Sequence, residues 1–118
     1  MRFGISLIMR GEEATPNAFV SMAKLAEETG LDALWCSSHF IIPQQTESRY
    51  AMSADGKLPE TWRQRYWDPW TTLAHLAATT KRIRLGTSVL ILPMHHPLEV
   101  ASIAANLDQW SGGRFNLG

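Results

Sequence analysis

Short apolar segments typical of β-strands alternate with amphipathic helical segments along this chain, and their spacing is the strongest constraint on its fold. The strand starts, Phe3, Ala33, Arg84 and Arg114, are 30, 51 and 30 residues apart. About 30 residues is the length of one βαβ unit. Strands that are apolar on both faces and separated by such helices form a parallel sheet covered by helices. The sequence therefore predicts an α/β fold with strands at residues 3–8, 33–37, 83–92 and from about 114 onward.

Each expected helix has a recognisable start and one apolar stripe. Thr15 and Asp68 are suitable N-cap residues, and each is followed by a proline, which favours the first helical position. Pro97 opens a third helix, which Gly112 ends. Apolar residues at i, i+3, i+4 and i+7 define the face that each helix buries. The three stripes are Phe19, Met22, Ala23 and Ala26; Trp70, Leu73, Ala74 and Ala77; and Val100, Ile103, Ala104 and Leu107.

The longest interval between strands contains a loop at about residues 38–67, which has turn residues and no sustained period. It follows the carboxyl end of the second strand, where α/β barrels and doubly wound sheets both build their sites. The phosphate-binding pattern of a dinucleotide fold is absent after the first strand, and no Walker sequence occurs. These absences favour a barrel over an open sheet. Four strands are only half of the eight in such a barrel.

Charge and cysteine content limit the binding partners and the cellular compartment that we expect. Eleven basic residues balance eleven acidic ones, so the field that attracts a protein to nucleic acid or to an anionic membrane is missing. The only cysteine, Cys36, has no disulfide partner within the chain, and no apolar run approaches the roughly 20 residues of a membrane span. The N-terminal residues lack the pattern of a signal peptide. We therefore expect a cytoplasmic protein that binds neither nucleic acid nor membrane.

Four segments, LWCSSHF, RIRLGTSV, LPMHHP and LDQWSGGRFNLG, occur in this order along the chain. With them the chain resembles the luciferase-like monooxygenase family, which includes bacterial luciferase and FMN-dependent or F420-dependent oxidoreductases. The resemblance covers nearly all residues outside 41–66. It implies a TIM (β/α)8 barrel, of which residues 1–118 are the N-terminal half, the first four βα units, with the fourth strand cut as it begins. The phosphate site of the cofactor would then lie beyond Gly118.

The resemblance also implies where a cofactor ring would lie. In the family a non-prolyl cis peptide at the end of the third strand stands beneath the ring, and by position it falls between Ser88 and Val89. Thr87, Ser88 and Val89 are therefore expected to bind the cofactor. The alternative is that these residues form an ordinary strand whose hydroxyls face neighbouring groups.

His39 is the expected catalytic residue, because the family usually has a histidine at the end of the second strand, near the ring. An imidazole titrates near neutral pH and suits proton transfer. The alternative is a loop histidine that caps a backbone carbonyl. Ser38 is expected to touch the cofactor, but the family commonly has an acidic residue there, which contacts F420 in dehydrogenase relatives. We therefore favour reduced FMN, with F420 as the alternative.

The other candidate residues are less suited to catalysis or metal binding. His95 and His96 point to opposite sides of an extended segment, and neither they nor His75 complete a zinc pattern, so no metal site is expected. Cys36 is interpreted as a small buried hydrophobe, and Arg114 as support for the end of a strand. Loop residues form either a lid whose arginines reach an anionic group or a solvated loop: Tyr50, Trp62, Arg63, Arg65, Tyr66 and Trp67.

The sequence leaves three functions open. The first, which is the leading hypothesis, is a monooxygenase that uses reduced FMN and O2 on a small organic substrate. The second is hydride transfer with F420. The third is a non-catalytic half-barrel that only folds and self-associates. Self-association is expected because the outer strands have unpaired edges and because inward side chains would lack an opposing half; Phe3, Ile5, Val89 and Ile91 are the expected inward residues. We therefore expect a homo-oligomer.

Overall fold

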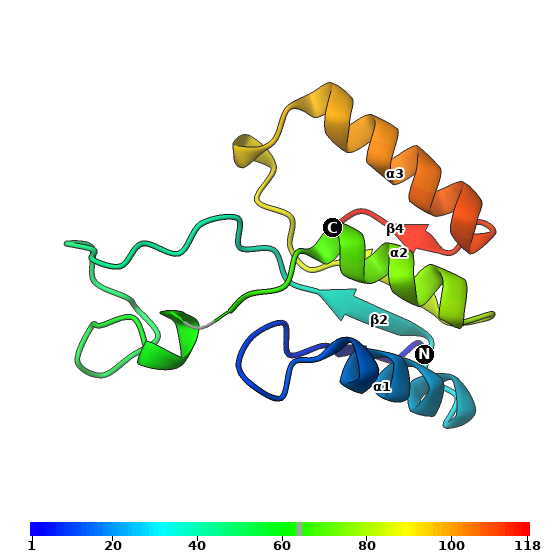
Figure 1. Ribbon diagram of the computed structural model, residues 1–118, viewed down its shortest axis with the longest axis horizontal. Coiled ribbons are helices and arrows are strands. Elements are labelled where there is room, and N and C mark those ends of the chain that lie inside the picture. The colour runs from blue at the N-terminus through cyan, green and yellow to red at the C-terminus, as the bar shows by residue number, and fades with distance from the viewer. Residues whose placement is uncertain (64) are drawn as a thin grey trace.

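Four parallel strands form one sheet in the order β1-β2-β3-β4, and each strand pairs with the next one along the chain (Figure 1). The computed structural model describes residues 1–63 and 65–118, without the side chains of Thr61 and Arg63. The sequential parallel order confirms the predicted α/β fold. The strands are β1 Gly4–Ser6, β2 Ala33–Cys36, β3 Arg84–Thr87 and β4 Phe115–Asn116, and the helices are α1 Pro16–Glu28, α2 Pro69–Thr79 and α3 Pro97–Ser111, with 3-10 turns η1 Glu60–Arg63 and η2 Leu92–Met94.

The three helices begin where the sequence predicts. The Thr15 hydroxyl accepts a hydrogen bond from the Ala18 amide at 3.2 Å, and the Asp68 carboxylate accepts one from the Thr71 amide at 2.8 Å. A proline occupies the first turn of each helix. The helix α3 ends at Gly112, whose φ of 70° is the left-handed conformation that favours glycine. Local capping therefore fixes the helix boundaries.

The helices lie side by side, with α2 packed between α1 and α3 (Figure 1). Their buried stripes meet alternate residues of the strands in one hydrophobic core. The sequence places Met22 in the stripe of α1, but its side chain is 40 % exposed, because it lies at the margin of the apolar face beside the edge strand. The core consists of Leu7, Met9, Ala14, Phe19, Ala23, Ala26, Leu34, Cys36, Leu73, Leu76, Ala77, Ile83, Leu85 and Leu107.

The first and third strands are shorter than predicted. β1 covers Gly4–Ser6 rather than residues 3–8, and β3 ends at Thr87 rather than continuing to residue 92. Beyond Thr87 the Leu90 amide donates to the Gly118 carbonyl at 2.7 Å, and the chain then enters η2. The predicted third strand is too long because residues 88–92 are mostly apolar, and apolar composition does not show where hydrogen bonding between strands ends.

The expected inward orientation of Ile5 is wrong. Ile5 packs against the core beneath the helices, together with Leu7 from the same strand. The opposite face of the sheet instead contains the indole of Trp35. A Cβ atom added to Gly4 would lie 2.6 Å from Trp35 Nε1, and one added to Gly86 would lie 2.5 Å from Trp35 Cζ3. The phase predicted for the first strand is wrong because both sets of alternate residues contain apolar side chains.

The amino-terminal edge of the sheet is held by two charged side chains. The Glu27 carboxylate accepts hydrogen bonds from the Lys81, Arg82 and Ile83 amides at 2.9, 2.5 and 2.8 Å. The Arg114 guanidinium donates to backbone carbonyls and a hydroxyl around the α2–β3 connection, as predicted from its place at a strand end. Its acceptors are the carbonyls of Ala77, Thr80, Ile83 and Ser111 and the Thr80 hydroxyl, at 2.5–3.1 Å.

Candidate functional site

The carboxyl ends of β2 and β3 place His39, Ser88 and Val89 at one edge of the sheet. Cys36 and Thr87 are register partners at the ends of these strands, and the Ser88 amide donates to the Cys36 carbonyl at 2.8 Å. The Ser88–Val89 peptide bond is cis, as the family resemblance implied. The long loop leaves the same edge and extends away from the helices (Figure 1). This edge therefore contains the residues that the sequence singled out for chemistry.

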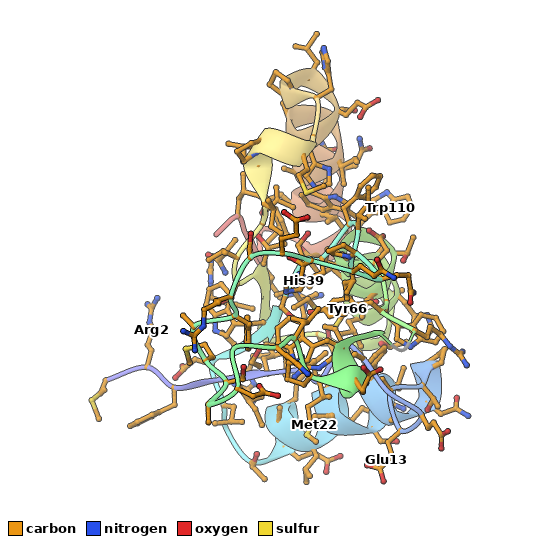
Figure 2. All side chains as sticks on the ribbon, turned by 90° about the vertical axis from the view of Figure 1, so that its left-hand side faces the viewer. Arg2, Glu13, Met22, His39, Tyr66 and Trp110 are labelled. Atoms are coloured by element: carbon orange, nitrogen blue, oxygen red, sulfur yellow. The ribbon has the colours of Figure 1, made fainter. Side chains whose placement is uncertain are left out.

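His39 lies among aromatic side chains of the loop. Its ring contacts Trp62 at a centroid distance of 4.9 Å and Tyr66 at 5.0 Å, both edge to face. Figure 2 looks onto this edge and shows His39 beside Tyr66. Burial lowers the pKa of His39 below its ordinary value of 6.5, and the positive charge of Arg10 lowers it further. At neutral pH the imidazole is therefore mainly uncharged and able to accept a proton.

Tyr66 connects the loop to the strands. Its hydroxyl lies 2.5 Å from the Ser37 hydroxyl. Its backbone forms an isolated antiparallel bridge with Arg10, and the Gly11 amide donates to the Arg65 carbonyl at 3.3 Å. The end of the loop is thus fixed against the segment that follows β1, and the Tyr66 ring is held against His39.

Arg10 and Ser37 are site residues that sequence reasoning missed. The guanidinium carbon of Arg10 lies 4.1 Å from the centroid of the Trp62 ring, a cation–π contact. The sequence indicates only that Arg10 comes just after the first expected strand and that Ser37 is the last residue of the second. The one available signal was position, because both residues lie at the carboxyl ends of expected parallel strands.

The four residues expected to bind a cofactor do not all reach this surface. Ser88 is exposed, and Val89 is 65 % exposed. Ser38 and Thr87 are only 4 % and 1 % exposed. The Thr87 hydroxyl is hydrogen-bonded to the backbone of Gly118, accepting from its amide at 3.0 Å and donating to its carbonyl at 2.9 Å. The structure therefore brings Ser88, Val89 and His39 to one edge and leaves the side chains of Ser38 and Thr87 inside.

The side chains of His96, His95 and Cys36 have other surroundings than that of His39. His96 caps α3, because its Nδ1 accepts a hydrogen bond from the Leu98 amide at 3.3 Å. The His95 ring packs between Phe40 and Trp70. Burial, then the charge of Asp68, raises the pKa of the Cys36 thiol to about 12, so this buried cysteine stays protonated. Among the described residues, no group of three or more His, Cys, Asp and Glu side chains is arranged to hold a metal ion.

A groove of about 620 Å³ runs between β1 and α1 rather than over His39. Apolar residues from β1, the segment after it and α1 line most of the groove, including Ile5, Ile8 and Met22, and Arg10 borders it. β1 is an edge strand of the described sheet, so one side of its backbone has no strand partner there. In the part of the chain that the structure describes, we find no helix with the length and apolarity needed to cross a membrane.

Sequence comparison connects the whole chain to one family. The family model of luciferase-like monooxygenases matches residues 1–118. An uncharacterised protein of Mycobacterium tuberculosis is 34 % identical over all 118 residues, which are 41 % of its own length. The 4-hydroxyprotoasukamycin monooxygenase of Streptomyces nodosus is 36 % identical over 84 % of this chain and 22 % of that protein. The F420-dependent glucose-6-phosphate dehydrogenase of Kineococcus radiotolerans is 34 % identical over 91 % of this chain and 27 % of that protein.

Solved structures give the same relationship in three dimensions. A monooxygenase from Streptomyces bottropensis superposes with a TM-score of 0.70 at 29 % identity, covering 100 % of this chain and 32 % of that one. The F420-dependent tetrahydromethanopterin reductase of Methanopyrus kandleri also superposes with a TM-score of 0.70, at 26 % identity, covering 99 % of this chain and 26 % of that one. The chain thus spans less than half the length of these relatives.

Proposed function

Because the chain belongs to the luciferase-like monooxygenase family, we propose that it forms one side of the active site of a flavin- or deazaflavin-dependent oxidoreductase. The proposal includes a TIM (β/α)8 barrel whose first four βα units are these residues. Support for the barrel comes from the sequential parallel strand order and from the fold of the structural neighbours. The observation that carries the functional proposal is the position of His39, half-buried at the carboxyl edge of the sheet.

In this proposal His39 transfers a proton to or from the substrate at an imidazole nitrogen. Its lowered pKa favours the uncharged form, which accepts a proton at neutral pH. Contacts with Trp62 and Tyr66 hold the ring and limit its exposure to water. Ser88 and Val89 form the exposed surface beside it, against which the cofactor ring would lie.

Reduced FMN is the cofactor that we propose, with O2 as co-substrate and a small organic molecule as acceptor of one oxygen atom. A reduced flavin supplies the electrons for this chemistry when it is bound. The residue before His39 supports FMN, because Ser38 stands where F420-dependent relatives commonly have an acidic residue, and its side chain is buried. F420-dependent hydride transfer is the second candidate, favoured by the 34 % identity to an F420-dependent dehydrogenase.

Cofactor titration of the full-length protein that contains this chain separates the two candidates. We expect quenching of FMN fluorescence on binding and a weaker response to F420. The reverse preference would move the assignment to hydride transfer. Failure to bind either cofactor would contradict the proposed function and leave the non-catalytic alternative.

The role of His39 is tested by His39→Gln in the same protein. With a substrate found by screening aldehydes, ketones and sugar phosphates for O2 or F420 consumption, we expect kcat to fall by roughly 10² to 10⁴, the usual range for losing a positioned acid or base. Cofactor affinity should change much less. His75→Gln is the matched control, because His75 is exposed on α2. Equal rates for both variants would reduce His39 to a structural residue.

Self-association stays a prediction. β1 and β4 are the edge strands of the described sheet, and edge strands pair readily with another chain. Light scattering after size exclusion tests this expectation, and a monomer at micromolar concentration would contradict it.

A further inference from the structure

We propose that Arg10 binds an oxyanion of the substrate, a carboxylate or a phosphoryl group, and so places the substrate beside His39. This inference rests on the proposed function, because it names the substrate class of the same site. It assigns a role to a residue that neither the sequence motifs nor the expected cofactor surface includes.

The guanidinium of Arg10 is held in place without using its hydrogen-bond donors. Its carbon lies 4.1 Å from the centroid of the Trp62 ring, and its backbone is fixed by the bridge to Tyr66. A guanidinium that stacks on an aromatic face leaves the N–H groups at its edge free to bind a carboxylate or phosphate in a two-pronged geometry. Arg10 is therefore oriented before any ligand arrives.

Among the described groups, which leave out Gln64 and the side chains of Thr61 and Arg63, no hydrogen bond or ion pair engages the Arg10 guanidinium. The neighbouring carboxylates, Glu12 and Glu13, are exposed on the loop that follows. Arg114 is the opposite case, because its guanidinium donates to four backbone carbonyls and one hydroxyl. A half-buried cation whose donors are unused by the protein gains more from an incoming oxyanion than an exposed cation does, because it is already partly removed from water.

The position of Arg10 relates the oxyanion to the reactive end of the site. The Trp62 ring contacts both side chains, the Arg10 guanidinium at 4.1 Å and the His39 ring at 4.9 Å, so Arg10 and His39 lie around the same indole. Tyr66, whose hydroxyl lies 2.5 Å from that of Ser37, also contacts the His39 ring. A substrate with its anionic group on Arg10 would thus extend toward His39 and the hydroxyl pair, which fixes one end and leaves the other for proton transfer.

Binding of simple anions tests this role without any cofactor or turnover. Benzoate is the carboxylate probe, benzamide its neutral counterpart, and inorganic phosphate the phosphoryl probe, each titrated into the cofactor-free full-length protein by NMR. We expect benzoate to bind and Arg10→Gln to weaken it about 10- to 100-fold, because hydrogen bonds to charged groups contribute about 1.5–3 kcal/mol. Benzamide should bind weakly and equally to both proteins.

Arg65→Gln is the matched control. Arg65 is part of the same backbone pairing, but its guanidinium lies 5.5 Å from the Trp67 ring and the side chain is exposed. We expect less than a twofold change in benzoate affinity. Equal loss in both variants, or no loss in Arg10→Gln, would overturn the assignment of Arg10, as would the absence of binding by both anions.

Two further readouts keep the test decisive. Anion binding at Arg10 should raise the pKa of His39 in the wild-type protein, because it neutralises a nearby positive charge, and this needs no variant to fold. An unchanged His39 titration in the presence of bound benzoate would place that anion elsewhere and contradict the proposal. Preference for phosphate over benzoate would identify a phosphoryl group as the natural oxyanion, and the reverse a carboxylate. The anion result stands whether or not FMN or F420 binds, so it fails or succeeds separately from the proposed function.

Discussion

The two edges of the sheet use charged side chains in opposite ways. At the amino edge, the Glu27 carboxylate and the Arg114 guanidinium are hydrogen-bonded to backbone groups of the connections that precede β3 and β4. At the carboxyl edge, His39 and Arg10 contact aromatic rings, and the guanidinium of Arg10 keeps its donors free of the described protein groups.

This difference distinguishes charged side chains that stabilise the fold from charged side chains that remain available to a ligand. A charge whose hydrogen bonds all go to the protein's own backbone fixes a connection, and its removal leaves carbonyls or amides unsatisfied. A charge held only by stacking costs little to remove from the fold and remains available to a ligand. In α/β barrels the carboxyl face carries the site and the amino face mainly stabilises the fold, and Arg10 and Arg114 are divided in the same way.

The largest expected effect is on the amino edge. Arg114→Gln should lower the free energy of unfolding by about 3 kcal/mol, because several carbonyls around the α2–β3 connection lose a charged donor. Urea unfolding measures this change. Arg2→Gln is the control, since Arg2 is exposed near the N-terminus and projects away from the body of the molecule (Figure 2). A change below about 0.5 kcal/mol, the size expected of a surface substitution, would break the comparison.

Gly86 lies within β3, between the amino and carboxyl edges of the sheet. Gly86→Ala should cost about 2 kcal/mol, because the new methyl group would meet both the Trp35 ring and the Asn116 carbonyl, the latter at 2.8 Å. Thermal unfolding of the variant tests this expectation. Adding Trp35→Phe should recover part of the loss, and a double variant no more stable than Gly86→Ala would show that the ring is not the obstacle.

The pH dependence of stability tests the role of Glu27 at the amino edge. Burial opposes its ionised form, but the hydrogen bonds from the Ile83, Arg82 and Lys81 amides outweigh burial and lower its pKa below the ordinary value of 4.5. A lowered pKa in the folded state means that the contribution of this carboxylate is complete above pH 4.5 and is lost as the pH falls through the folded-state pKa. Urea unfolding at about pH 3 and about pH 6 should therefore show a smaller pH difference for Glu27→Gln than for the wild type, and identical differences would contradict this role.

The smallest expected stability effect is at the carboxyl edge. Arg10→Gln should lower the free energy of unfolding by about 0.5–1 kcal/mol, the usual contribution of one cation–π contact. It should also raise the pKa of His39, because one of the two causes that lower it is removed. NMR titration of the imidazole measures the second effect. A stability loss as large as that of Arg114→Gln would abolish the distinction between the two edges.

The fold was largely predictable because its signals are local. Thr15 and Asp68 cap their helices as the sequence indicated, and β2 and β3 start at the predicted residues, Ala33 and Arg84. The phase of the first strand was not predictable, since Ile5 and Ile8 are both apolar and only the tertiary fold decides which of them faces the helices.

The candidate site was predictable only in part. His39 and the Ser88–Val89 bond were found by family resemblance at the ends of strands, and the cis bond is confirmed. Arg10 contacts Trp62, which is far from it in the sequence and lies in a loop without periodicity, so no local pattern predicts this contact. The burial of Ser38 and Thr87 likewise depends on packing that composition does not reveal. The expected role of Arg63 falls on a side chain outside the described residues.

The indole of Trp35, which lies over Gly4 and Gly86, has a consequence for how this sheet evolves. A ring of this size fits only while both glycines lack a side chain, so the three positions must change in a fixed order, with the ring replaced by a smaller residue before either glycine is lost. Position 4 would then accept a side chain more readily than position 86. A methyl group added at Gly4 would lie 3.0 Å from the Ala33 carbonyl oxygen. One added at Gly86 would lie 2.8 Å from the Asn116 carbonyl oxygen, and this tighter backbone contact would remain after the ring is lost. Homologues with a small residue at position 35 should therefore vary at position 4 while they keep glycine at position 86.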